Sequence, residues 1–132
     1  MSHIFPIRVY YEDTDMGGIV YHANYLKFIE RARSDWVRDL GIDQRAMKEE
    51  EGAAFAVRRI ECDYLMAARF DDRLEVRTQM QLVTGARLVL RQEVTRDGAM
   101  VFAAIVTIVC LGNAGQPARL PANIRALLHQ PA

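Results

Sequence analysis

The chain has few of the residues on which common hydrolytic and metal-dependent sites are built. Its two serines, Ser2 and Ser34, stand outside any GxSxG pattern, which argues against a serine hydrolase. Its three histidines, His3, His22 and His129, lack the spacing of zinc ligands, and the sequence contains neither a phosphate-binding loop nor a dinucleotide-binding fingerprint. The sequence therefore predicts no metal site and no cofactor.

The sequence also has no excess of charge of one sign and no apolar run long enough to span a membrane. Seventeen basic residues balance seventeen acidic ones, whereas proteins that bind nucleic acids usually carry a basic patch. The longest apolar run, residues 99–111, is too short to cross a bilayer as a helix. Cys62 and Cys110 lie in apolar runs without ligand spacing, which favours free thiols. We expect a cytoplasmic protein with no nucleic-acid partner and no membrane insertion.

Residues 24–40 carry the pattern of a long amphipathic helix. Asn24 is a suitable N-cap, and Gly41 is placed to end the helix in a left-handed conformation. Asp43 is placed to cap a second, shorter helix over residues 43–50. The apolar positions of the long helix recur at steps of three or four residues: Tyr25, Phe28, Ile29, Ala32, Trp36 and Leu40.

The remainder of the chain has the shorter period of β-strands. We expect strands over residues 4–11, 53–64, 74–82, 88–94 and 100–111. Asp97-Gly98 predicts a hairpin turn, and residues 121–129 a final short helix. The sequence thus predicts one α+β domain, residues 1–132, in which an antiparallel five-stranded sheet is covered by one long helix. The uncovered sheet edges favour a homodimer.

The segment between the first strand and the long helix holds the candidate catalytic groups. Asp15 precedes the pair Gly17-Gly18, and His22 precedes the helix. An exposed aspartate, with a reference pKa near 3.9, is a charged base or nucleophile at neutral pH. A helix N-terminus offers unpaired N–H donors to a developing oxyanion. From the local pattern alone, simpler alternatives remain: Asp15 and Asp13 as turn formers and His22 as a loop residue.

Residues 14–25, TDMGGIVYHANY, resemble the active-site signature of hotdog-fold thioesterases of the 4-hydroxybenzoyl-CoA thioesterase class. The wider stretch 9–33, VYYEDTDMGGIVYHANYLKFIERAR, is especially similar to the acyl-CoA thioesterases associated with the Tol-Pal cell-envelope system, the YbgC type. The resemblance continues through residues 58–76, RRIECDYLMAARFDDRLEV, and weakly through residues 117–121. It covers most of the chain and implies a hotdog fold.

The resemblance also implies an activity, hydrolysis of acyl-CoA thioesters, for which we expect short-chain or aromatic acyl groups. It makes Asp15 the catalytic base or nucleophile, places the oxyanion donors near His22, and gives the His22 side chain a supporting role. A thiol has a pKa of about 8.5, so the thiolate can leave without a strong general acid. Coenzyme A is then part of the substrate. The expected substrate-binding residues are Gly17, Gly18, Ile19, Val20, Tyr25, Arg58 and Arg59.

The sequence leaves the role of two arginines, the oligomeric state and two rival functions open. Arg58 and Arg59 should point to opposite faces of their strand, so that one could meet the phosphates of coenzyme A, but a plain surface role is the alternative. The resemblance implies self-association as a dimer or a homotetramer. A hotdog hydratase or dehydratase with a histidine base is one rival function. A non-hydrolytic module that binds acyl carrier protein or Tol-Pal partners is the other.

Overall fold

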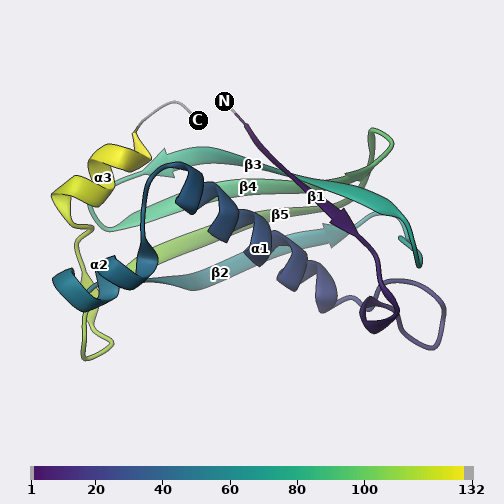
Figure 1. The fold of residues 1–132 in the computed structure, drawn as a ribbon, viewed down its shortest axis with the longest axis horizontal. Coiled ribbons are helices and arrows are strands. Elements are labelled where there is room, and N and C mark those ends of the chain that lie inside the picture. The colour runs from purple at the N-terminus through teal and green to yellow at the C-terminus, as the bar shows by residue number, and fades with distance from the viewer. Residues whose placement is uncertain (1, 130–132) are drawn as a thin grey trace.

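A computed structural model describes residues 2–129, so the two ends of the predicted domain, residue 1 and residues 130–132, lie outside the described residues. A long helix crosses one face of an antiparallel sheet (Figure 1). The helices and strands are β1 His3–Arg8, the 3₁₀ turn η1 Tyr11–Asp13, α1 Asn24–Asp39, α2 Gln44–Glu51, β2 Ala54–Tyr64, β3 Arg73–Val83, β4 Arg87–Arg96, β5 Ala99–Leu111, β6 Pro117–Ala118 and α3 Ala122–Leu128.

The sheet has the order β1-β3-β4-β5-β2, and all its pairings are antiparallel. The five predicted strands are therefore confirmed. The two-residue strand β6, which pairs with Cys110 and Leu111 of β5, was not predicted, because two residues are too few to show an alternating pattern. The Asp97-Gly98 turn between β4 and β5 is confirmed, and both residues have the positive φ of such a turn, 50° and 80°.

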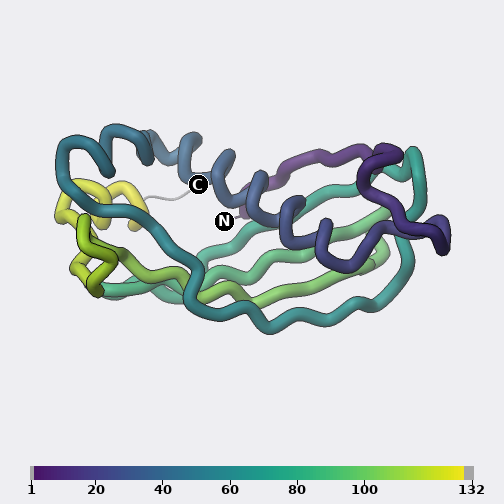
Figure 2. Tube along the Cα trace, turned by 90° about the horizontal axis from the view of Figure 1, so that it is seen from below, coloured from purple at the N-terminus to yellow at the C-terminus, as the bar shows by residue number. Residues whose placement is uncertain are grey.

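Helix α1 forms one layer and the sheet the other, with the apolar face of the helix between them (Figure 2). All six apolar helix positions expected from the sequence are buried, and Phe28, Ile29 and Ala32 have no exposed surface. The sheet contributes alternate side chains, such as Val76 of β3 and Leu90 of β4. The hotdog fold predicted by the resemblance is the observed fold.

The predicted N-cap role of Asn24 is wrong. Ala23 occupies the cap position with helical backbone angles, and Asn24 already lies in the first turn of α1. The Asn24 side chain is buried and donates a hydrogen bond of 2.9 Å to the carbonyl oxygen of Asp13. A turn over residues 22–23 begins the helical path of the backbone earlier than the sequence pattern indicates. The side chain of Asn24 therefore points back to the preceding loop. Asn24 thus joins the start of α1 to the segment that carries Asp15.

The end of α1 and the start of α2 follow the prediction. Gly41 has a φ of +90° and donates to Arg38, while the amide of Ile42 donates to the carbonyl of Val37, a Schellman motif. Asp43 caps α2, and its side chain accepts hydrogen bonds from the amides of Arg45 and Ala46.

The Asp43 cap gives a first test of the local structure. We expect the Asp43→Ala substitution to lower the free energy of unfolding by about 1 kcal/mol, since it removes the acceptor of two amides at the start of α2. Urea unfolding followed by circular dichroism measures this change. Glu49→Ala, an exposed change within the same helix, is the control and should stay within about 0.5 kcal/mol of wild type. Equal effects of the two variants would contradict the capping role.

Candidate functional site

Asp15 begins a tight turn at one end of the molecule. Its amide donates to the carbonyl of Ile19, and its own carbonyl accepts from the amide of Gly18. One carboxylate oxygen, Oδ1, accepts a 2.9 Å hydrogen bond from the amide of Gly17. Gly18 has a φ of +79°, a conformation that a residue with a side chain adopts only with strain. Asp15 is therefore a turn former. Its carboxylate is exposed, and the other oxygen, Oδ2, has no hydrogen-bond partner among the described residues.

The start of α1 is fixed to the same turn by Asp13. The carbonyl of Asp13 accepts from the amide of Tyr21 and from the side chain of Asn24, both at 2.9 Å. The Asp13 side chain is buried, and its carboxylate accepts from the amide of Tyr10 at 2.8 Å. Asp13 thus has the structural role that the sequence favoured for it. It also fixes where Asp15 lies relative to the helix.

The amides at the start of α1 remain available. The carbonyl oxygen of Tyr21 accepts a 2.8 Å hydrogen bond from the amide of Asn24. The amides of His22 and Ala23, in contrast, have no acceptor in the part of the chain that the structure describes. Free N–H groups at this end of a helix, together with the helix dipole, favour a developing negative charge. They have the properties of an oxyanion-binding site.

Asp15 and the start of α1 line one cavity of about 380 Å³. Five residues expected at the site are brought together there: Asp15, Ile19, Val20, His22 and Tyr25. Gly17 and Gly18 form the turn beside it rather than its wall. The remaining lining comes from the end of β2 and the segment after it, residues 64–67.

Tyr64, at the end of β2, is a lining residue that the sequence analysis missed. Its hydroxyl donates a 2.9 Å hydrogen bond to the carbonyl oxygen of His22. Its ring lies edge-on to the rings of His22, Tyr25 and Phe102, with centroid distances of 6.1, 5.6 and 5.1 Å. Burial raises the pKa of Tyr64 above its ordinary value, so the hydroxyl stays a donor at neutral pH. The resemblance covers this residue, but nothing in its neighbourhood marks it for this role.

Tyr25 forms the inner wall of the cavity. It is 3% exposed and stacks on Phe102 of β5 at 4.9 Å. Burial raises the pKa of its phenol, and the backbone of Ala68 and the charge of Arg96 act in the opposite direction. Tyr25 is thus a neutral aromatic surface rather than an acid or base at neutral pH.

Arg58 and Arg59 do not line this cavity. A β-bulge between Val57 and Arg59 leaves Arg58 without a partner residue on β5, so the regular alternation assumed for these arginines is interrupted. Both are exposed, and Arg59 pairs with Glu61 at 2.9 Å. They precede Tyr64 by five and six residues, about 17 Å or more along a strand. Their contact with coenzyme A stays a prediction.

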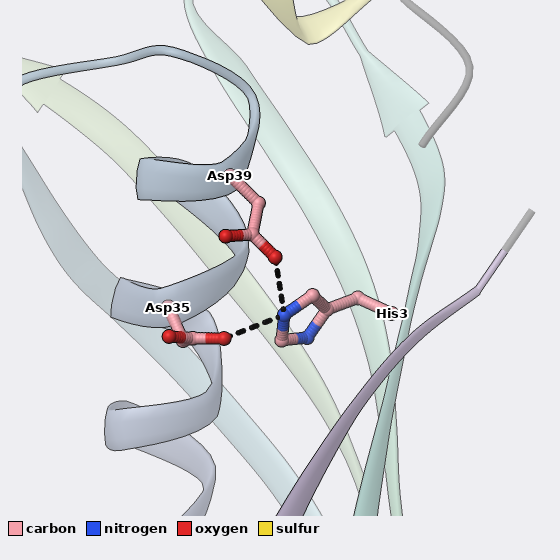
Figure 3. A group of neighbouring side chains, drawn as sticks. All are labelled: His3, Asp35 and Asp39. Atoms are coloured by element: carbon pink, nitrogen blue, oxygen red, sulfur yellow. Dashed lines mark hydrogen bonds and ion pairs between the residues drawn. The ribbon is translucent and has the colours of Figure 1, made fainter.

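A second group of polar side chains lies at the opposite end of α1 (Figure 3). His3 Nε2 is 2.9 Å from a carboxylate oxygen of Asp35 and 3.3 Å from one of Asp39. Histidine and aspartate are metal ligands, and their ligand atoms lie within 4.8 Å of one another here. A metal on Nε2 would leave the proton on Nδ1, which is buried and has no partner among the described residues. We therefore interpret the group as a tie between β1 and α1.

In residues 2–129, no helix has the length and apolar character needed to cross a membrane.

Comparisons with known proteins agree with the fold and with thioesterase activity. Residues 17–103 match the family model of the Thioesterase superfamily. The chain is 43% identical over 127 residues to an acyl-CoA thioesterase of Haemophilus influenzae, YbgC, with 95% of this chain and 93% of that protein covered.

Solved structures of similar proteins have the same fold. A probable thioesterase from Bartonella henselae is 37% identical, with a TM-score of 0.88 and coverage of 92% of this chain and 100% of that one. A 4-hydroxybenzoyl-CoA thioesterase variant in complex with 4-hydroxybenzoyl-CoA shares the fold, with a TM-score of 0.89, 22% identity and coverage of 96% and 97%. The chain therefore belongs to the Thioesterase superfamily and is a hotdog-fold thioester hydrolase, as the resemblance predicted.

Proposed function

We propose that the protein hydrolyses acyl-CoA thioesters with Asp15 as the catalytic carboxylate. The observation that carries this proposal is the cavity that Asp15 and His22 both line, next to two amides at the start of α1, those of His22 and Ala23, that have no acceptor among the described residues. The H. influenzae relative is named an acyl-CoA thioesterase, which supports coenzyme A as the carrier.

The reaction follows from this arrangement. The thioester carbonyl oxygen accepts hydrogen bonds from the amides near His22, which stabilise the negative charge that forms on it. Asp15 either takes a proton from water, whose hydroxide adds to the carbonyl carbon, or attacks that carbon itself. The C–S bond then breaks and the thiolate leaves, as the low pKa of the thiol permits. Where Asp15 has attacked, this step leaves a mixed anhydride, which water hydrolyses to release the acid and restore the Asp15 carboxylate. The products are a carboxylic acid and coenzyme A.

His22 and Tyr64 support this chemistry in different ways. The imidazole of His22 is exposed and lines the cavity, so it can hold the reacting water. Tyr64 holds the His22 carbonyl and with it the peptide group that ends in the amide of Ala23. The rings of Tyr25 and Tyr64 give the cavity aromatic walls, which support an aromatic or short acyl group.

A hydrolysis screen tests the proposal. Wild type is assayed with acyl-CoA substrates of graded length and with an aromatic acyl-CoA, and thiol release is measured. We expect turnover of short-chain or aromatic substrates. No turnover of any acyl-CoA, with stable capture of acyl carrier protein, would instead support the binding module. Association with Tol-Pal partners stays a prediction of the resemblance.

Substitutions of His22 and Asp15 separate hydrolysis from hydration. His22 lines the cavity together with Asp15, so a histidine-based hydratase or dehydratase uses the same residues in other roles. That function requires His22→Ala to abolish activity while Asp15→Asn retains much of it. We expect the opposite result, in which Asp15→Asn lowers the activity more than His22→Ala does.

We also propose that two copies associate through β2. This strand is an edge of the sheet and is eleven residues long. The other edge strand, β1, has six residues and contains Pro6, which has no N–H to offer a neighbour. An unprotected long edge favours pairing with another strand. In a two-fold, antiparallel β2 pair centred between Arg59 and Tyr64, Arg58 and Arg59 of one copy lie opposite the Tyr64 end of the other, and this register supports their predicted contact with coenzyme A.

Light scattering after size exclusion tests this association. We expect about 30 kDa, twice the 15.0 kDa of one chain, for wild type at micromolar concentration. Val57→Lys, on β2, should shift the protein toward the monomer, because it places a charge in the pairing edge. Leu82→Lys on β3 is the matched control, since Val57 is 46% and Leu82 42% exposed. A monomeric wild type, or equal effects of both substitutions, would overturn the β2 interface, and a mass near 60 kDa would indicate the predicted tetramer.

The cytoplasm stays the predicted location. Cys62 and Cys110 are free thiols in the structure, which supports a reducing compartment.

A further inference from the structure

Phe102 of β5 lies behind the aromatic wall of the cavity that Asp15 lines. Its side chain has no exposed surface and is not itself part of the cavity wall. In the sheet it stands opposite Tyr64 of β2, and the centroids of the two rings are 5.1 Å apart. From the helix side, the ring of Tyr25 stacks on Phe102 at 4.9 Å, with 11° between the two planes. Phe102 therefore supports both aromatic residues that line the cavity.

The strand of Phe102 also holds another part of the cavity wall. The carbonyl oxygen of Val101 accepts hydrogen bonds from the amides of Leu65 and Met66, at 2.9 and 3.2 Å. Leu65 and Met66 line the cavity, and Val101 has no exposed surface. The inner end of the cavity is thus fixed from the sheet side by two consecutive buried residues of β5.

An acyl-CoA has one favourable orientation in this cavity. Its coenzyme A part carries phosphates, whose charges are costly to remove from water, whereas the acyl group gains by leaving water. With the thioester carbonyl on the amides near His22, the acyl group therefore extends inward along the start of α1, toward Tyr25, which is 3% exposed. The ring of Tyr25 has no space to move into on the side of Phe102, because the two rings are in contact and protein interiors are close-packed.

We propose that Phe102 is a specificity-determining residue, whose size sets the longest acyl group that the cavity accepts. It acts by holding the ring of Tyr25 in the path of the acyl group. From the proposed function this takes only that an acyl-CoA binds in the cavity. A second copy paired through β2 can narrow the cavity at Tyr64, but it does not reach Phe102, which is fully buried between α1 and the sheet of its own chain.

Binding of graded analogues measures the limit without turnover. The probes are S-(2-oxoalkyl) thioethers of coenzyme A, in which a methylene separates the sulfur from the carbonyl, so that there is no thioester to hydrolyse. Titration calorimetry gives their affinities for wild type over a series of chain lengths. We expect the affinity to rise about fourfold with each added methylene until the chain reaches Tyr25, and then to stop rising.

The Phe102→Ala substitution should move this limit to longer chains. It leaves a space behind Tyr25 into which the ring can turn, because the surrounding core relaxes only partly around such a loss. We expect the variant to bind analogues beyond the wild-type limit about tenfold tighter than wild type does, and the shorter analogues within about twofold. Phe102→Leu removes less volume and should shift the limit in the same direction. It replaces Phe102→Ala if circular dichroism shows that the latter does not fold.

Leu88→Ala is the matched control. Leu88 is 1% exposed and pairs with Ile108 of β5, which is six residues, or about 20 Å, along the strand from Phe102. It does not line the cavity of Asp15. Its substitution also removes buried apolar volume, but at the other end of the sheet, so the variant should keep the wild-type limit.

An unchanged limit in a folded Phe102 variant would overturn the proposal, because another wall or a second copy would then stop the acyl group. An equal change of affinity at every chain length would reduce Phe102 to a structural residue. A wild-type affinity that rises through the whole series, or no binding of any analogue, would mean that the cavity has no such limit. If wild type binds the analogues up to a limit but hydrolyses no acyl-CoA, the proposed hydrolysis fails and the role of Phe102 stands.

Discussion

The Asp15→Asn variant is expected to lose between about a hundredfold and ten-thousandfold in kcat/KM for acyl-CoA hydrolysis, the contribution of a well-placed general base. Asparagine keeps a side-chain oxygen that accepts the amide of Gly17, so the turn is preserved while the charge and basicity are removed. The loss therefore reports on chemistry rather than on folding. Steady-state thiol release with the preferred substrate from the screen measures it.

Glu12→Gln is the matched control for this experiment. Glu12 is an exposed carboxylate in the same loop and does not line the cavity, so its loss of charge should change kcat/KM less than twofold. A folded Asp15→Asn variant with more than a tenth of wild-type activity would contradict a catalytic role for Asp15. In single-turnover hydrolysis in labelled water, label in the Asp15 carboxylate indicates covalent attack, and its absence indicates a base.

The largest effect on stability is expected at Gln92. Its amide nitrogen donates to the carbonyl of Ile29 and to the hydroxyl of Thr78, both at 2.9 Å, and its oxygen accepts from Arg33. Gln92→Met keeps the approximate size of the side chain but removes these three hydrogen bonds between α1 and the sheet. We expect the free energy of unfolding to fall by about 3 kcal/mol, because each buried group left without a hydrogen bond costs about 1–3 kcal/mol and such costs are not additive.

Urea unfolding of Gln92→Met and Gln81→Met measures the difference. Gln81 is an exposed glutamine of the neighbouring strand β3, and its substitution should change stability by less than about 0.5 kcal/mol. If Gln92→Met were as stable as wild type, the buried polar bonds between α1 and the sheet would be dispensable and apolar packing alone would hold the two layers together.

The residues at the helix ends show which contacts a local sequence pattern can predict. Gly41 and Asp43 have the roles that their neighbours in sequence indicate, since both act on amides and carbonyls within a few residues. Asn24 has the residue type of a cap as well, but its side chain bonds to the carbonyl of Asp13, eleven residues earlier. The prediction was wrong because a tertiary partner competed with the local one.

The proposed catalytic segment could be located from the sequence because its signature is continuous in the chain. Asp15, the glycine turn and the helix start follow one another within residues 15–24, and in the structure Asp15 and His22 line the same cavity. Tyr64 is forty-two residues from His22, and only the closing of β2 beside the start of α1 brings its hydroxyl to that carbonyl. No periodicity signals such a contact.

The sequence alone determined the element types, the buried face of α1 and the turn that carries Asp15, because periodicity, capping and turn chemistry act over a few residues. The tertiary structure decided the sheet order, the bulge beside Arg58, the partner of Asn24 and the hydrogen bond of Arg33 to Gln92. These depend on which side chains meet after the sheet closes around the helix. Burial and the loss of water then change what each polar group must bind, and no local pattern encodes that change.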